Sequence, residues 1–166
     1  NSQRVYSRPM ILAGIDEAGY GPLLGPLVVG CCAFELQGAV PADDLPCLWK
    51  LLRRIVSKNK LKSGRKLHVN DSKQVYSPSI GLKELERSIL CIMLARGTTA
   101  ATLADFLEAV APHAVPDLSH HPWYAAAPDE SFPLEQDALS LTLFAKALRV
   151  EMDRSGTRLI HMAARI

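Results

Sequence analysis

Two adjacent carboxylates, Asp16 and Glu17, follow the apolar run Met10–Ile15. A short apolar run bounded by turn residues predicts a buried strand. Neighbouring strand residues point to opposite faces, so one carboxylate should point into a site, and a turn after Asp16 could swing the second toward it. Hard cations such as Mg²⁺ prefer oxygen ligands of this kind. The pair therefore indicates metal chemistry, although acidic residues before glycine and proline are also typical of solvated turns.

Glycines follow the carboxylates at once, in the order Gly19-Tyr20-Gly21 and then Pro22. Glycine allows unusual backbone dihedrals, so the chain can approach a ligand closely with its amides free to meet a phosphate. Carboxylates and such a turn together suggest metal-dependent phosphate chemistry.

The charge of the chain is unevenly distributed. Its net charge is only +2, yet the stretch from residue 50 to residue 66 holds eight basic residues and no acidic one. The rest of the chain has 11 basic residues against 17 acidic ones. Clustered cations on an otherwise acidic protein are typical of nucleic-acid binding, whereas the alternative is a solvated flexible loop. The eight are Lys50, Arg53, Arg54, Lys58, Lys60, Lys62, Arg65 and Lys66.

The sequence of residues 14–26, GIDEAGYGPLLGP, resembles the signature of the type 2 ribonucleases H, the ribonuclease HII family. The resemblance implies that Asp16 and Glu17 are catalytic metal ligands and that Gly19, Tyr20 and Gly21 read the minor groove of an RNA-containing duplex. The family has arginine where this chain has Tyr20. A phenol can stack and make one hydrogen bond, but it lacks the planar cation, so the resemblance supports metal binding more firmly than recognition of a ribonucleotide junction.

A second stretch, Asp71-Ser72-Lys73, is similar to an Asp-Ser-Lys run that precedes the first long helix of that family. The resemblance places Ser72 and Lys73 near the nucleic-acid backbone, and a hydroxyl beside a point charge suits a phosphate. The basic loop is the other expected contact with nucleic acid, through Lys58, Lys60, Lys62, Arg65 and Lys66.

Hydrophobic spacing predicts the elements that must position these residues. We expect an antiparallel pair of strands at 10–16 and 27–36, then a helix capped by Asp44 and running to about Val56. The next predictions are a helix from Ser79, a third strand at 88–94, helices at 102–110 and 134–154, and a strand at 157–163 parallel to the first. The proline-rich segment 111–133 has little periodicity and is expected to be an irregular loop pinned by aromatic side chains.

The fold class implied by the resemblance is α/β, with a ribonuclease H-like mixed sheet of antiparallel strands 1–3 and a parallel strand 4, flanked by helices. Residues 1–166 would form a single domain that lacks the C-terminal part of the family. The family uses a third and a fourth carboxylate, and no residue of this chain is a candidate for either. Asp137 and Asp153 lie at or on the last predicted helix rather than at a strand end.

The activity implied is cleavage of RNA in RNA–DNA hybrids, or beside a single ribonucleotide in a duplex, with two Mg²⁺ or Mn²⁺ ions clamping the scissile phosphate. Either residues beyond Ile166 supply the missing carboxylates or catalysis has been lost, so for these 166 residues we predict weak or no nuclease activity. A non-catalytic nucleic-acid-binding protein and a different metal-dependent nuclease are the alternatives. We expect a cytoplasmic monomer without a membrane partner, because no apolar run approaches bilayer length.

Overall fold

The computed structural model describes residues 9–18, 27–37, 46–118, 120 and 122–166. Its main sheet has three strands in the order β1-β2-β5, with β2 in the centre. The strands are β1 (Met10–Ala18), β2 (Val28–Leu36) and β5 (Thr157–Arg165). The antiparallel pairing of β1 with β2 confirms the prediction for the first two strands.

The last strand runs in the same direction as β1, as predicted, but it pairs with a different strand. β5 pairs with β2 in an antiparallel ladder and not with β1. Because β1 and β5 are both antiparallel to β2, they run in the same direction with β2 between them. The predicted parallel strand 4 is therefore wrong as a pairing in this sheet. The parallel pairing among the described residues is the short ladder of β3 (Val56–Ser57) with β4 (Leu67–His68).

The predicted third strand at residues 88–94 is wrong, because these residues belong to the helix α3 (Lys83–Arg96). The run is apolar on all sides, so its periodicity could not separate a buried strand from a buried helix. Burial continues into the flanking turns of the helix, and α6 packs along it. Ser79 does not cap α3, because it lies in a turn closed by a bridge between Ser77 and Gly81, after which the helix starts.

The helix predicted at 134–154 is α6 (Ala138–Ser155), with Asp137 as its N-cap and Gly156 as its C-cap. It starts four residues later than expected, after Asp137, whose carboxylate accepts a hydrogen bond from the Ser140 backbone N–H and so caps the helix. The buried carboxylate of Glu86 accepts hydrogen bonds from the backbone N–H groups of Leu134 and Glu135 and ties the preceding segment to α3.

The remaining helices are short. α1 (Leu48–Leu51) covers only part of the helix predicted from Asp44, which itself lies outside the described residues. α2 (Ser72–Val75) begins within the Asp-Ser-Lys stretch, and α4 (Leu103–Val110) confirms the prediction for 102–110. The irregular segment 111–133 contains α5 (Val115–Leu118) and the 3₁₀ turns η1 (Pro112–Ala114), η2 (Pro122–Tyr124) and η3 (Ala127–Asp129).

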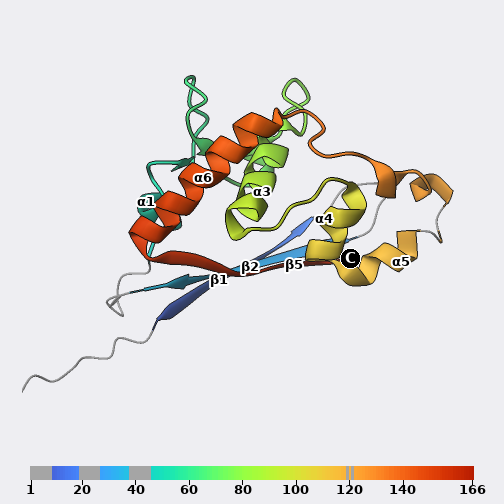
Figure 1. The fold of residues 1–166 in the computed structure, drawn as a ribbon, viewed down its shortest axis with the longest axis horizontal. Helices are drawn as coiled ribbons and strands as arrows, with labels where there is room; N and C mark the ends of the chain where they lie inside the picture. Colours follow the sequence, from blue (N-terminus) through green and yellow to red (C-terminus); the bar gives the residue numbers. More distant parts are fainter. Residues whose placement is uncertain (1–8, 19–26, 38–45, 119, 121) are drawn as a thin grey trace, which may run out of the picture.

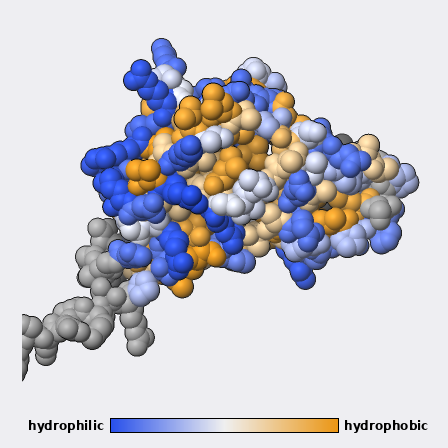
Figure 2. Space-filling view, viewed as in Figure 1, coloured by the Kyte–Doolittle hydropathy of each residue, from blue (hydrophilic) through white to orange (hydrophobic). Residues whose placement is uncertain are grey.

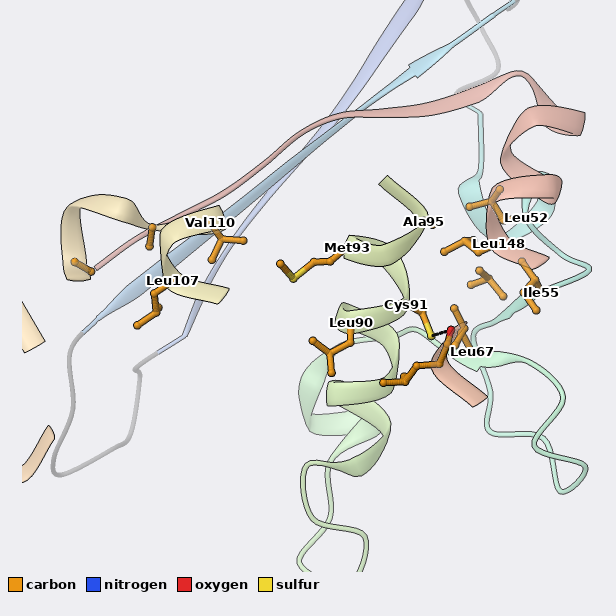
Figure 3. Close-up of a cluster of buried hydrophobic side chains, with 14 residues drawn as sticks. Leu52, Ile55, Leu67, Leu90, Cys91, Met93, Ala95, Leu107, Val110 and Leu148 are labelled. Atoms are coloured by element: carbon orange, nitrogen blue, oxygen red, sulfur yellow. Dashed lines mark hydrogen bonds between the residues drawn. The ribbon is translucent and has the colours of Figure 1, made fainter. Parts of the chain in front are cut away.

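The helices gather on one side of the sheet, with α6 crossing α3 and with α4 and α5 near the far end of β5 (Figure 1). The largest fully buried side chains among the described residues are Leu67, Cys91, Met93 and Leu148, which come from β4, α3 and α6 (Figure 3). The Cys91 thiol donates to the carbonyl oxygen of Leu141 at 3.6 Å and so joins α3 to α6. Within the described ranges, no helix has the length and apolar character needed to cross a membrane.

Candidate metal centre and nucleic-acid surface

The carboxylate pair lies inside β1 rather than after it. The strand continues to Ala18, and Asp16 and Glu17 are paired with Gly30 and Val29 of β2. The prediction that a turn after Asp16 brings the second carboxylate toward the first is therefore wrong, because the ladder holds both residues extended and on opposite faces. Both side chains are exposed, and Asp16 Oδ1 accepts a hydrogen bond from the Glu17 backbone N–H at 3.0 Å.

Gly30 stands directly opposite Asp16. Among the described residues, an added Cβ at Gly30 would meet the Asp16 backbone oxygen at 3.9 Å and no other atom within 4 Å. Directly opposed residues of an antiparallel ladder share a face. No side chain at position 30 therefore fills the space beside the Asp16 carboxylate.

Glu17 shares its face with residues that the sequence did not single out. Val29 pairs with Glu17 on one side and with Arg165 on the other, so the end of β5 is level with the carboxylate pair. A pocket of about 300 Å³ at this end of the sheet is lined by Ile15, Val29, Cys31, Val110, Pro112, His113, Ala163, Ala164 and Arg165. His113 and Arg165 line this pocket together with Ile15, the residue before the carboxylate pair.

Neither His113 nor Arg165 was among the predicted site residues. Arg165 lies beyond the predicted last strand, and only the register of β5 with β2 brings it level with Glu17. His113 Nε2 accepts a hydrogen bond from the Ile166 backbone N–H at 3.4 Å, which ties η1 to the end of β5. The sequence signal for both would have been the continuation of the strand to residue 165.

Asp16 or Glu17 alone could be a ligand of a hydrated Mg²⁺ or Mn²⁺ ion, but the two do not fit one shared site, because they point to opposite faces of β1. Mg²⁺ commonly binds through one or two carboxylates and substrate phosphates while keeping several waters. Within the part of the chain that the structure describes, no group of three or more histidine, cysteine, aspartate or glutamate side chains is placed to hold a metal. Asp137 caps α6 by accepting from the Ser140 N–H at 2.7 Å, and Asp153 lies in that helix, so neither joins the pair.

The glycine turn predicted to read the minor groove, Gly19-Tyr20-Gly21, lies outside the described residues. Its predicted role stays a prediction.

The Asp-Ser-Lys stretch starts α2. Asp71 is the N-cap, and its Oδ1 accepts from the Lys73 backbone N–H at 2.8 Å. Ser72 and Lys73 are exposed. The neighbouring Asn70 donates its side-chain N–H to the Lys58 carbonyl oxygen at 3.2 Å, so the structure brings this stretch to the start of the basic loop.

The cations of the basic loop, residues 58–66, fall into two groups. Lys58 lies over the exposed ring of Trp49 at 5.4 Å, Lys60 forms an ion pair of 3.5 Å with Glu84, and Lys66 donates to the Arg53 carbonyl oxygen at 2.5 Å. Lys62 and Arg65 are exposed and make no ion pair or hydrogen bond with the described residues. The two free cations are the ones best placed to meet an external phosphate.

The structure does not bring the basic loop to the carboxylate pair. The loop between β3 and β4 projects from the helical layer, at the top of Figure 1, whereas the end of β1 lies in the sheet behind α4. The predicted site is thus divided into a carboxylate end of the sheet and a separate basic surface formed by residues 58–66 with 70–73.

No protein-family model, curated protein or solved structure matches this chain. The resemblance to the type 2 ribonucleases H therefore rests on the motif residues.

Proposed function

We propose that this protein is a metal-dependent endonuclease, similar to ribonuclease HII, that cleaves RNA in RNA–DNA hybrids or in ribonucleotide-containing duplexes. The observation that carries the proposal is the exposed pair Asp16 and Glu17 near the C-terminal end of β1, within the motif at residues 14–26. We also propose a ribonuclease H-like identity for the fold and a cytoplasmic location, which agrees with the free thiols of all four cysteines.

Asp16 and Glu17 would each be a ligand of Mg²⁺ or Mn²⁺, on opposite faces of β1 and so not of one shared ion, and the metal would supply water activation and stabilisation of the leaving oxygen. Asp16 has one carboxylate oxygen that accepts no hydrogen bond from the described residues, and this oxygen is available to the ion. Lys62, Arg65 and Lys73 would neutralise backbone phosphates and position the duplex.

The test is Mn²⁺ binding and cleavage by the 166-residue chain, compared with its Asp16→Asn variant. We expect Mn²⁺ binding that the substitution weakens at least tenfold, because it removes a charged ligand. Cleavage of a labelled hybrid is expected to be weak and to disappear in Asp16→Asn. Unchanged metal binding in Asp16→Asn, or cleavage that survives the substitution, would refute the proposed site.

A non-catalytic nucleic-acid-binding function is the second candidate, because the free cations of the basic loop lie away from the carboxylates. It predicts hybrid binding that needs no metal and survives Asp16→Asn. Lys62→Gln and Arg65→Gln should each lower the slope of log affinity against log salt by about one, since each removes a phosphate contact. Lys60→Gln is the matched control, because Lys60 is already paired with Glu84.

A different metal-dependent nuclease is the third candidate, with Tyr20 marking a changed substrate. Cleavage of an RNA–DNA hybrid should be compared with cleavage of a DNA duplex and of single strands of each kind. Preference for the hybrid supports the ribonuclease HII-like function, and metal-dependent preference for DNA supports the third candidate.

A further inference from the structure

Trp49 of α1 has an indole ring that is 40% exposed. Its Nε1–H donates to the carbonyl oxygen of Val69, directly after β4, at 2.8 Å. The tryptophan N–H is the one polar group of this side chain, so a hydrogen bond to the backbone fixes the edge of the ring. The exposed part of the ring is therefore held in one position at the protein surface.

The basic surface meets this ring directly. Lys58 Nζ lies 5.4 Å from the centroid of the Trp49 ring. Asn70, the residue after Val69, donates its side-chain N–H to the Lys58 carbonyl oxygen at 3.2 Å. Three segments that are distant in the sequence thus come together at Trp49, namely α1, the start of the basic loop and the stretch that leads into α2.

Cations predominate in the sequence around the ring. The stretch from Lys50 to Lys73 holds nine basic residues and one acidic residue, Asp71. The Asp71 carboxylate accepts the Lys73 backbone N–H at the start of α2. The loop between β3 and β4 is hydrophilic where it projects at the top of the molecule (Figure 2). A polyanion is therefore attracted to the region that holds Trp49.

An exposed aromatic ring among cations suits a single strand better than a duplex. The bases of a duplex are stacked on each other and present only their edges in the grooves, whereas the bases of a single strand can stack on an aromatic side chain. A cation over an exposed ring contributes less than a stacked base does. A base can therefore replace the Lys58 ammonium on the Trp49 ring, and Lys58 is then free to meet a phosphate of the same strand.

We propose that Trp49 is a stacking platform for a base of single-stranded nucleic acid, whose phosphates contact Lys58, Lys62 and Arg65. Every base has a π-face, so the stack does not select a sequence. The inference rests on the proposed binding of nucleic acid by the basic surface, and it adds a substrate class, the single strand. It needs neither a metal ion nor the carboxylate pair.

The test compares two labelled single strands by fluorescence anisotropy in the presence of a chelator, one of deoxythymidines and one abasic strand with the same number of phosphates. We expect Trp49→Ala to raise the Kd for the deoxythymidine strand at least about fivefold and to leave the Kd for the abasic strand unchanged. Lys62→Gln should weaken the binding of both strands, because it removes a phosphate contact. Trp123→Ala is the matched control, because Trp123 lies in η2, outside the basic surface, and it should bind as the parent does.

A second variant separates stacking from a structural role of the side chain. Trp49→Phe keeps an aromatic ring without the N–H, and it should bind the deoxythymidine strand more tightly than Trp49→Ala does. Absence of binding to the deoxythymidine strand, no loss in Trp49→Ala, or an equal loss for both strands would overturn the inference. The proposed nucleic-acid binding has its own readout, which is the binding of an RNA–DNA hybrid and its weakening by Lys62→Gln, and this result does not depend on Trp49.

Discussion

Gly156 joins α6 to β5, and we predict that Gly156→Ala destabilises the fold more than Gly64→Ala does. The two glycines have nearly equal backbone angles, with φ of 63° and 62°. Their surroundings differ. An added Cβ at Gly156 would lie 3.3 Å from Gln37 Cβ and 3.4 Å from the Gln37 carbonyl oxygen, whereas an added Cβ at Gly64 meets nothing within 4 Å.

The difference between the two variants isolates the contact with Gln37. A left-handed backbone costs a non-glycine residue about 1–2 kcal/mol. The lower entropy of the unfolded chain returns about 0.4–1 kcal/mol of this cost. Both terms apply to each variant. At Gly156 the new methyl group also pushes on Gln37, whose N–H donates to the Gly156 carbonyl oxygen at 2.8 Å. Weakening that hydrogen bond adds about 1 kcal/mol.

Urea unfolding followed by circular dichroism measures both free energies, provided that the m-value is unchanged. We expect Gly156→Ala to lose about 1 kcal/mol more than Gly64→Ala. Equal losses in the free energy of unfolding, or a larger loss in Gly64→Ala, would show that the backbone at the junction of α6 and β5 shifts without cost to accommodate the methyl group. That result would refute the reasoning from the Gln37 contact.

Three further predictions concern the core and its ionisable groups. Leu148→Ala should cost about 2–5 kcal/mol in urea unfolding because Leu148 is 2% exposed, whereas Leu139→Ala on the same helix, at 68% exposure, should change stability by less than about 0.5 kcal/mol. Hydrogen bonds from Arg154 hold the pKa of Glu151 below its usual value. The ionised carboxylate therefore stabilises the folded protein at pH values above the pKa of Glu151 in the unfolded chain. This stabilisation is lost as the pH falls through the lower pKa of Glu151 in the folded protein. Melting temperatures between about pH 6 and about pH 3 should therefore fall less in Glu151→Gln than in the parent. Burial raises the pKa of Cys91 to about 11, so Cys91 should be alkylated last of the four cysteines at about pH 8.

The strands and helices with one apolar face could be predicted from the sequence, but the helical structure of residues 88–94 in α3 could not. Thr102 and Asp105 form a capping box at the start of α4, where local hydrogen bonds decide the boundary. The run at 88–94 is apolar throughout, so its local pattern is the same for strand and helix. The start of α6 does have a local signal, the N-cap Asp137, which the predicted start at residue 134 missed.

The residues of the candidate site could be predicted from the sequence, but their partners in the folded protein could not. The sequence located the carboxylates and the basic loop, because each is a continuous run of residues. It could not give the partners of the lysines, since Lys60 meets Glu84 only when the loop returns to α3.

The separation of the carboxylates from the basic loop bears on how a duplex could bind. Asp16 and Glu17 face opposite sides of β1, so a phosphate at Asp16 approaches one face of the sheet, while Glu17 shares the other face with Arg165, with Val29 of β2 between them. The basic loop projects from the helical layer away from that end (Figure 1). A duplex that contacts both surfaces must therefore extend over the molecule. The two surfaces contribute together to the affinity only when the duplex is long enough to reach both. Under the proposed nuclease function, metal-dependent chemistry would depend on Asp16, and the basic loop would set the affinity and its dependence on salt.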